Sequence, residues 1–599
     1  MDTTAVPVIN GKFLYYAFVA GANQIINNQA EINRINVFPV NDKDTGTNLA
    51  STIRSVIDNT RPLKSYKQTV SSIANAALFG ARGNSGVIFA QFLYGINRET
   101  QDKTSISLTD FAESIIKSIP YIYKAIANPV EGTMLTVIKD WSYYLDSKKE
   151  LIYDFKSVFI DSFYVIEKSL VRTTGTLKVL EKSGFVDAGA KGFVLFIKGI
   201  IDFIENKNVR SLVSNNIVSI PAFQESVVSD EKICERYCSE AIIRDLNIDV
   251  NDLKIVLDGY GDSIVVAGSK DLTRIHIHTN KPDVLFNRLS SCGTITYQKV
   301  DDMIRQHEVL TNRKWNIALV SDSTCDLSDE LIDYYQIHIV PMNLSFGETE
   351  YLDKVTIKPN KFYDLLNTEA EFPKTSQINE QVFTNLYSHL VSEYDAIIAV
   401  HLTDKFSGTY SNSVKAAERI MKESNKAIHV IDSKNLSGAL GLIVLKAARS
   451  IEEGNDVDSI VSVINQDIDN TKIFVSVKDI KYMIRGGRVS KKKGLIAKIL
   501  GVNPIVSMDS DGNSLLFDKA FGQKSGLKKI YKHIDKLMQN KTVWNYMILH
   551  AHNMNEVKDM EAKIHKMTGK EPVSIVDISP VIGMHAGDGA IAISLLFNK

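Results

Sequence analysis

The spacing of apolar residues changes along this chain, and that change limits what it can fold into. Up to about residue 205, apolar residues recur three and four positions apart, as in FLYYAFVAGANQIINN and VIFAQFLYGI. This spacing is typical of amphipathic helices. From Trp315 onward, β-rich runs such as WNIALVSDST alternate with amphipathic helical segments, which predicts a parallel sheet covered by helices. The chain is therefore expected to begin as an all-α domain and to end as an α/β domain.

The length of the chain requires several domains. Its 599 residues exceed what one hydrophobic core can serve, since domains average about 150 residues. A polar, irregular stretch from about Glu205 to Glu231 is typical of a linker, and a small α/β unit follows it to about residue 312. We predict three domains, residues 1–208, 209–312 (linker included) and 313–599.

Composition and charge argue against several classes of protein. Sixty-nine basic residues balance 70 acidic ones, for a formal charge of −1, so a nucleic-acid binder is not expected. Four cysteines in this length, with no secretory signal, favour a reduced, cytoplasmic location. The most apolar stretch, GFVLFIKGIIDFI from Gly192, is too short and too charged to span a bilayer. Any lipid is expected to be met in water or by transient contact with a membrane surface.

An acidic loop in the helical part has the composition of a metal site. Residues 36–48 read NVFPVNDKDTGTN. Asp42 and Asp44 lie two positions apart, so in an extended segment both carboxylates face one side, and such oxygens suit Mg²⁺. Thr47 and Asn48 follow with groups that can touch a phosphate or cap a helix. A turn at a helix start with solvated acids fits this stretch equally well.

Three further loops are rich in small residues. They are GARGNSG at 80–86, PVEGTMLT at 129–136 and DAGAKG at 187–192, each leading into an apolar helical segment. Glycines let the backbone approach a phosphate, and the N–H groups at a helix start favour an anion; ordinary helix-helix turns remain the alternative. The chain contains no GxxxxGK[ST], which excludes a P-loop.

These loops, in this order, resemble the ATP-binding domain of the dihydroxyacetone kinase family, and more closely the kinase subunit of bacterial fatty acid kinase. The resemblance covers residues 9–204. It implies a barrel of antiparallel helices holding ATP and two Mg²⁺, with Asp42 and Asp44 as magnesium ligands. The positions implied for ATP are Asn36, Thr47, Asn48, Gly83, Asn84, Ser85, Thr133, Asp187 and Gly189. This chain departs from the family pattern with Asn41 in place of proline and Lys43 in place of glycine.

The small middle unit contains a candidate metal set. In the strand-like TRIHIHT, His276 and His278 share one face, and Cys238 lies in the earlier segment RYCSE. Two imidazoles and a thiolate suit a tetrahedral zinc ion with one open position, although strand histidines are often simply hydrogen-bonded. These segments resemble the middle domain of the same kinase subunit, which implies a bound metal and favours Zn²⁺ in a structural or docking role.

Small polar groups follow the strands of the last part. SDSTCD follows the first strand, KTSQ occupies 374–377, and FSGTY occupies 406–410 after AIIAVHL. Ligands in open α/β sheets bind beyond the carboxyl ends of strands, so we expect these groups to meet.

With IRGGRVSK from Ile484 and the terminal SPVIGMHAGDGAIAI, these segments resemble the DegV family over residues 316–597. The resemblance implies two α/β subdomains with a fatty acid in an apolar tunnel between them. Its carboxylate would be held by Thr375, Ser407 and His585, with Ser376 and Arg488 adjacent. A turn serine and a capped loop are the plainer interpretations of Ser407 and His585. Phe521 stands where the family often has a basic residue, which leaves open whether Lys519 or Lys524 supplies that charge.

Together the resemblances imply a fused fatty acid kinase. ATP with Mg²⁺ would phosphorylate the fatty-acid carboxylate to acyl phosphate, feeding exogenous fatty acids into phospholipid synthesis. A fatty acid is already ionised near neutral pH, so no general base is required. Asp42, Asp44, Ser407 and His585 are expected to carry the reaction, His585 as a hydrogen-bond donor, in a homodimer. The alternatives are a noncatalytic fatty-acid carrier or regulator with a vestigial kinase domain, and a kinase for a small hydroxylated substrate such as dihydroxyacetone.

Overall fold

The computed structural model describes residues 6–38, 43–151, 154–206, 233–369, 371–487 and 503–598. Two predicted site residues, Asp42 and Arg488, lie outside these ranges, as does most of the predicted linker. The chain forms two compact units, Met1–His307 and Glu308–Lys599. The order of architectures confirms the multidomain prediction: helical, then a small α/β unit, then α/β.

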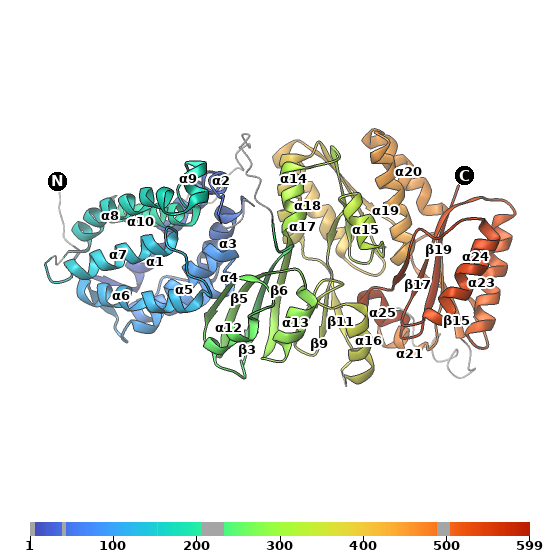
Figure 1. The fold of residues 1–599 in the computed structure, drawn as a ribbon, viewed down its shortest axis with the longest axis horizontal. Helices are drawn as coiled ribbons and strands as arrows, with labels where there is room; N and C mark the ends of the chain where they lie inside the picture. Colours follow the sequence, from blue (N-terminus) through green and yellow to red (C-terminus); the bar gives the residue numbers. More distant parts are fainter. Residues whose placement is uncertain are drawn as a thin grey trace. The chain divides into compact units, whose positions relative to one another are not determined.

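The first part of the Met1–His307 unit is helical, as its periodicity predicted (Figure 1). A short antiparallel pair, β1 (Val8–Asn10) with β2 (Ser105–Ser107), links the segment before α1 to the segment before α6. The helices are α1 (Gly11–Asn27), α2 (Gln29–Arg34), α3 (Thr45–Asn59), α4 (Tyr66–Gly80), α5 (Gly83–Glu99), α6 (Leu108–Ala125), α7 (Met134–Lys148), α8 (Phe155–Thr176), α9 (Lys178–Ser183) and α10 (Ala188–Asn206).

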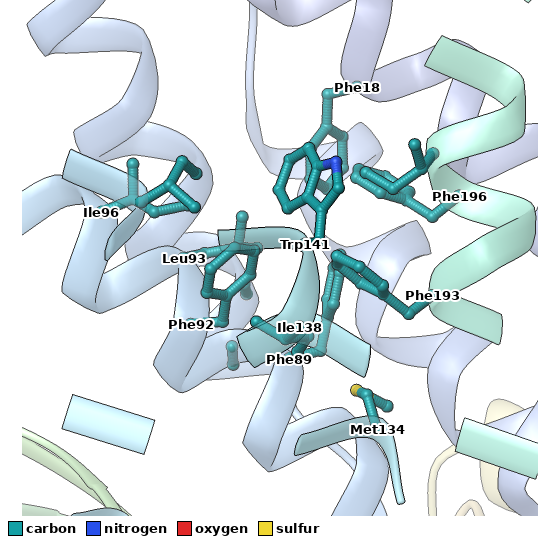
Figure 2. Packing of buried hydrophobic residues seen from close by; sticks show 14 of the residues in the cluster. Phe18, Phe89, Phe92, Leu93, Ile96, Met134, Ile138, Trp141, Phe193 and Phe196 are labelled. Carbon is teal, nitrogen blue, oxygen red and sulfur yellow. The ribbon is translucent and has the colours of Figure 1, made fainter. Parts of the chain in front are cut away.

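An aromatic core holds these helices together. Figure 2 shows Trp141 of α7 and Phe193 and Phe196 of α10 pointing into it. The rings of Trp141 and Phe193 meet edge to face with centroids 5.6 Å apart, a favoured aromatic geometry. The buried indole N–H of Trp141 donates to Ser162 Oγ at 3.0 Å. The apolar faces seen in the sequence therefore point inward.

The middle part of the same unit is an antiparallel sheet of order β4-β5-β3-β6. Its strands are β3 (Tyr237–Arg244), β4 (Asp262–Gly268), β5 (Leu272–Thr279) and β6 (Thr294–Asp302), with helices α12 (Val250–Leu257), α13 (Pro282–Ser290) and α14 (Met303–Thr311). Alternation along β4 sends Ile264 and Val266 to the core under α12 and α13, and Val265 and Ala267 to the helical core. The sheet thus packs directly against the helical domain, and Gln91 Oε1 of α5 accepts the Gly268 N–H at 3.0 Å.

The second unit contains the predicted parallel sheet. Its order is β13-β12-β7-β8, with every pair parallel. The strands are β7 (Ile317–Asp322), β8 (His338–Val340), β12 (Ala396–His401) and β13 (Ala427–Asp432). The helices that follow these strands or pack near them are α15 (Asp329–Tyr334), α17 (Glu380–Glu393), α18 (Thr409–Ser424), α19 (Ser437–Glu452) and α20 (Val457–Asn470).

Its second sheet differs from the prediction, because it is mixed. The order is β16-β15-β14-β19-β17-β18, and of these pairs β17 and β18 run parallel while the others are antiparallel. A tight turn closed by the Asp509 N–H and Asn513 C=O joins β15 to β16, and so short a connection can join only antiparallel strands. The strands are β14 (Thr471–Ser476), β15 (Asn503–Met508), β16 (Ser514–Ala520), β17 (Val543–His550), β18 (Ile575–Asp577) and β19 (Ile591–Phe597).

Smaller elements complete this unit. Three antiparallel strands have the order β10-β9-β11. They are β9 (Asn343–Phe346), β10 (Thr349–Leu352) and β11 (Lys374–Ser376), and the remaining helices are α16 (Pro359–Thr368), α21 (Lys481–Arg485), α23 (Gln523–Met538), α24 (Met554–Thr568) and α25 (Pro580–Ala586). Within the described residues of the whole chain, every helix is too short or too polar to cross a membrane.

Candidate functional site

The loops singled out in the helical domain come together at the amino-terminal ends of α3, α5, α7 and α10. A Cβ added at Gly83 would collide with the Asn48 amide, so the starts of α3 and α5 touch. A Cβ added at Gly189 would lie 2.8 Å from Ser85 Oγ and 3.0 Å from Met134 Cε. Helix starts present free N–H groups and positive dipole ends, so their convergence forms a region suited to anions.

The acidic loop is held at the start of α3. Asn36 is buried, and its Oδ1 accepts the Thr45 N–H at 2.9 Å. Asp44 occupies the N-cap position of α3. Lys43 has a φ of 54°, in the left-handed region that favours glycine, which explains why the residue type expected there is glycine. Since Asp42 lies outside the described residues, Asp44 is the placed member of the predicted magnesium pair.

Thr47 faces α2. Its Oγ1 accepts hydrogen bonds from Asn33 Nδ2 at 2.9 Å and Gln29 Nε2 at 3.0 Å, and its N–H donates to Asn33 Oδ1 at 3.0 Å. Both hydroxyl lone pairs are thereby used, which leaves the O–H proton for a ligand. The main contribution of Thr47 is to fix α3 against α2.

Asp187 joins two helix starts. Its Oδ1 accepts the N–H of Ala190 at 2.7 Å in α10 and the N–H of Met134 at 3.0 Å in α7, and its side chain is 6% exposed. Burial raises the pKa of Asp187 to about 6, although these two N–H groups act in the opposite direction. Asp187 therefore links the starts of α7 and α10 through hydrogen bonds from their backbone N–H groups to its carboxylate.

Asn84 carries an unsatisfied acceptor in the same region. Its Oδ1 is buried and has no hydrogen-bond partner among the described residues. A buried amide oxygen without a donor costs free energy, and a cation or a ligand N–H satisfies it. Thr133, by contrast, donates its hydroxyl to Val130 O at 2.8 Å. Asn84 and Ser85 are thus the ligand-facing candidates of the α5 start.

Glu240 of β3 is a functional candidate that sequence reasoning missed. Its buried carboxylate accepts the Gly83 N–H at 2.6 Å and an Arg274 Nη2–H at 2.7 Å, and lies 3.4 Å from Arg82 Nη1. Burial opposes its ionisation, but Arg274, His276, Lys299 and Arg82 together outweigh burial and hold the pKa of Glu240 well below its usual value. The signal was available in part, since Glu240 lies two positions after Cys238 and shares its face of the strand.

The predicted metal set of the middle part is assembled. One potential ligand atom from each of Cys238, His276 and His278 lies within 4.8 Å of the others. His276 Nε2 and His278 Nε2 are 3.2 Å apart, close to the roughly 3.4 Å that two nitrogens bound tetrahedrally to Zn²⁺ would have. His276 Nδ1 lies 3.7 Å from Glu240 Oε1 and 3.8 Å from Cys238 Sγ, and His278 Nδ1 lies 3.5 Å from Asp262 Oδ1.

The protonation tendencies of this set also suit a metal. Burial lowers the pKa of His276, which keeps it in the neutral, ligating form. Burial raises the pKa of the Cys238 thiol, and Glu240, Asp301 and Asp44 act in the same direction. A buried thiol of this kind ionises when a cation compensates its charge. Since the Asp44 carboxylate acts on Cys238, the set lies on the side of the sheet that faces the acidic loop.

The second unit has a cavity of about 210 Å³ that gathers the predicted head-group residues. Thr375, Ser376, Ser407 and His585 all line it, which leaves Arg488 as the member outside the described residues. The other lining residues are Met342, Gln377, Leu402, Phe406, Gly408, Val581 and Ile582. A lining that combines hydroxyl and imidazole groups with apolar side chains suits an amphiphile with a carboxylate head.

Local contacts fix the groups that line this cavity. Ser407 Oγ pairs with Thr409 Oγ1 at 2.8 Å just before α18. His585 belongs to α25, and a Cβ added at Gly486 would collide with its ring. Asp353 Oδ1 accepts the Val581 N–H at 3.2 Å near the start of α25. By contrast, Phe521 follows β16 with 79% of its side chain exposed.

A buried polar network lies beneath the loop that carries Ser407. His401 Nδ1 is 3.2 Å from Asp322 Oδ2, His401 Nε2 is 2.9 Å from Ser413 Oγ, and Ser413 Oγ is 2.6 Å from the Tyr387 hydroxyl. Asp322 Oδ2 also accepts the Leu402 N–H at 2.9 Å. The order Asp-His-Ser resembles a hydrolytic triad, but all its members are fully buried, so the network supports the loop rather than meeting a substrate.

Comparison with protein families finds three matches along the chain. Residues 39–202 match the DAK2 domain, residues 235–310 match the FakA-like middle domain of fatty acid kinase, and residues 316–598 match the DegV family, described as uncharacterised proteins.

Individual relatives match parts of the chain. An uncharacterized protein of Staphylococcus haemolyticus is 31% identical over 320 residues, 51% of this chain and 58% of that protein. A DegV domain-containing protein of Clostridium acetobutylicum is 30% identical over 288 residues, 47% of this chain and 99% of that protein. The chain thus spans less than two thirds of the length of its staphylococcal relatives.

Among solved structures, DegV of Bacillus subtilis, titled a fatty acid binding protein, is 27% identical. It covers 48% of this chain and 100% of its own, with a TM-score of 0.43. A DegV family protein of Thermus thermophilus, titled for fatty acid binding, is 23% identical, covers 47% of this chain and all of its own, and has a TM-score of 0.44. The chain belongs to the DegV family, and its DAK2, FakA-like middle and DegV domains match the architecture of a fused fatty acid kinase.

Proposed function

We propose that this chain is a fatty acid kinase. ATP with Mg²⁺ at the helical domain transfers its γ-phosphoryl group to the carboxylate of a fatty acid held in the second unit, giving acyl phosphate and ADP. The observation that carries the proposal is the gathering of Thr375, Ser376, Ser407 and His585 around one cavity. The three functional parts are residues 1–208 for ATP, 209–312 for the middle domain and 313–599 for the acyl chain.

The nucleotide site is assigned to the meeting helix starts, at one end of a barrel of antiparallel helices. Asp42 and Asp44 would hold Mg²⁺, which when bound would supply positive charge to neutralise the phosphates. Ser85 meets the phosphates, with Gly189 leaving room beside it, as the close approach at Gly189 supports. The unsatisfied Asn84 oxygen is an acceptor, so it is assigned to the metal or to a ligand N–H near the phosphates. Asn36, Thr47, Asn48, Thr133 and Asp187 hold the surrounding loops in place.

The acyl site holds a reactant that needs alignment. The carboxylate is already ionised, so Thr375, Ser407 and His585 act as hydrogen-bond donors that orient it. An unpaired buried carboxylate would be costly, which is why several donors are required. Holding both reactants in a fixed alignment, so that they need not meet by diffusion, supplies much of the rate enhancement expected of such a transfer.

A Zn²⁺ ion held by Cys238, His276 and His278 is part of the proposal. When bound, it would supply a cross-link between strands β3 and β5 without taking part in phosphoryl transfer. The support is the 3.2 Å separation of the two imidazole nitrogens and the neutral form of His276. We further propose a cytoplasmic homodimer that exchanges fatty acids by transient contact with membrane surfaces and supplies acyl phosphate for phospholipid synthesis.

A noncatalytic fatty-acid carrier is the second candidate. Lys43, with its φ of 54°, strains the backbone of the loop that bears the acidic pair. Strain at a metal-binding loop is expected in a kinase domain that no longer needs to bind Mg²⁺. Such a carrier would bind fatty acid in the same cavity but release no ADP.

One experiment separates the two. Native mass spectrometry of the purified protein is expected to find a bound fatty acid, and incubation with ATP, Mg²⁺ and oleate is expected to give ADP together with acyl hydroxamate on trapping. Asp44→Asn should abolish ADP formation while the fatty acid stays bound, and Asp58→Asn, an exposed acid on the same helix α3, should change neither. Retained lipid without ADP formation in the wild type would favour the carrier, and absence of lipid would refute both functions.

A further inference from the structure

One carboxylate oxygen of the middle part faces both the metal set and the glycine-rich loop. Glu240 Oε1 accepts the N–H of Gly83, the first residue of α5, at 2.6 Å. The same Oε1 lies 3.7 Å from Nδ1 of His276, its register partner on β5. Glu240 Oε2 is used separately, by Arg274 and Arg82. A shift of Oε1 would therefore change both its hydrogen bond with the Gly83 N–H and its distance from His276 Nδ1.

The surroundings of Glu240 leave it little freedom. Glu240 and Arg274 are each 1% exposed, and Arg274 also donates to Ala81 O in the glycine-rich loop. The guanidinium groups of Arg82 and Arg274 lie 5.0 and 4.9 Å from the ring centre of Tyr297. A buried network of this kind has few alternative arrangements, so a change at one member is passed to the others.

We propose that Glu240 is a positioning residue that couples the Cys238–His276–His278 metal site to the phosphate-binding loop at residues 80–86. This inference rests on the proposed function, since it assigns nucleotide binding to that loop. It makes the affinity for nucleotide depend on whether the metal is bound.

The coupling follows from the tautomer of one histidine. A metal on His276 Nε2 fixes the proton on Nδ1, which then points at Glu240 Oε1, the usual arrangement of a carboxylate behind a metal-bound histidine. Without the metal, Nε2 of His276 and Nε2 of His278 face each other at 3.2 Å, and one of them must carry a proton. When His276 carries it there, the bare Nδ1 lone pair can accept the S–H of Cys238, whose Sγ lies 3.8 Å away, but it no longer donates to Glu240 Oε1 and repels it. The carboxylate then moves, and its hydrogen bond to the Gly83 N–H weakens.

Reciprocity supplies a direct test on the full chain. If metal strengthens nucleotide binding, nucleotide must strengthen metal binding by the same factor. The probes are Zn²⁺, measured by competition with a chromogenic chelator, and ADP with Mg²⁺, whose binding is checked by calorimetry on the same sample. We expect saturating ADP with Mg²⁺ to tighten Zn²⁺ binding at least about fivefold, the lower end of usual coupling strengths.

Two variants assign the effect to Glu240. Glu240→Gln should reduce the coupling to less than about twofold. The matched control is Asp262→Asn, which removes the exposed acid facing the other metal-ligating histidine, and it should keep the coupling even if Zn²⁺ binds more weakly.

The possible outcomes are distinct. Equal Zn²⁺ affinity with and without bound nucleotide in the wild type overturns the coupling and leaves the proposed function standing, and this result does not depend on whether either variant folds. Coupling retained in folded Glu240→Gln overturns the assignment to Glu240. Absence of nucleotide binding in the calorimeter overturns the proposed function and the coupling with it.

Discussion

At the scale of single residues, Lys43 carries backbone strain beside a candidate magnesium ligand. Its φ of 54° costs a residue with a Cβ roughly 1 kcal/mol. Lys43→Gly removes that strain, whereas Lys43→Ala removes the same side chain but keeps the Cβ. We expect the glycine variant to exceed the alanine variant in free energy of unfolding by up to about 1 kcal/mol, since the unfolded-state entropy of glycine offsets part of the gain.

The measurement needs a probe that reports on the helical domain alone. Trp141 lies in the core of this domain, whereas Trp315 and Trp544 belong to the second unit. Urea unfolding followed by Trp141 fluorescence, in a background where the other two tryptophans are phenylalanine, isolates the effect. An alanine variant more stable than the glycine variant would contradict the strain.

Asp187 makes a pH-dependent contribution to the same domain. Burial raises its pKa from 3.8 to about 6 in the folded chain. The folded state is therefore more stable with the carboxyl protonated than with it ionised. This stabilisation is complete below about pH 4 and is lost as the pH rises through 6. Asp187→Asn keeps the acceptor oxygen but does not titrate. Relative to the wild type, the variant should gain up to about 3 kcal/mol in free energy of unfolding between pH 4 and pH 7.

Trp141 fluorescence in the same tryptophan background measures this difference. Asp140→Asn, an acid on α7 that pairs with Arg172 at the surface, is the control and should show no comparable rise across that range. A constant difference between wild type and Asp187→Asn from pH 4 to pH 7 would show that the Asp187 carboxyl does not titrate there.

At the scale of elements, the loop between β12 and α18 depends on the buried network under it. Ser413→Ala removes the hydroxyl that His401 Nε2 and the Tyr387 hydroxyl share. Leaving these partners unsatisfied should lower the free energy of unfolding of the second unit by about 1–3 kcal/mol. The loop that carries Ser407 should also loosen, so that bound fatty acid exchanges faster.

The control for this prediction lies on the same helix. Ser424 Oγ of α18 donates to Ile420 O of its own helix and accepts the Lys426 N–H at a long 3.4 Å. It touches neither His401 nor the Ser407 loop, so Ser424→Ala should change stability less than Ser413→Ala and should change exchange little. Urea unfolding read by Trp315 and Trp544, together with exchange of a labelled fatty acid, measures both effects. Equal behaviour of the two alanine variants would show that the network does not support the Ser407 loop.

Local sequence predicted the elements better than it predicted their contacts. Helical periodicity before residue 205 and the β-rich runs after Trp315 gave the right architectures, because burial of one face leaves a local pattern. The motif residues Thr375, Ser407 and His585, taken from the family resemblance, line one cavity, and their role in holding a fatty acid stays a prediction. Glu240 was missed because its partner Gly83 lies 157 positions away. Asp322 lies in the SDSTCD segment, but its pairing with His401 was missed because the two are 79 positions apart. Asp187 was recognised as a site residue, but no local pattern indicated that its carboxylate accepts backbone N–H groups instead of facing a ligand.

At the scale of the whole molecule, one polypeptide carries both proposed substrate sites. A covalent link keeps the local concentration of each site around the other independent of dilution. We therefore expect the turnover number, in ADP per chain at saturating ATP and oleate, to stay constant over a roughly hundredfold dilution. Mixing Asp44→Asn chains with Ser407→Ala chains then distinguishes two routes, because only transfer between the chains of a dimer restores activity. A turnover number that falls in proportion to dilution would mean that productive encounter requires separate molecules, and fusion would then have no kinetic role.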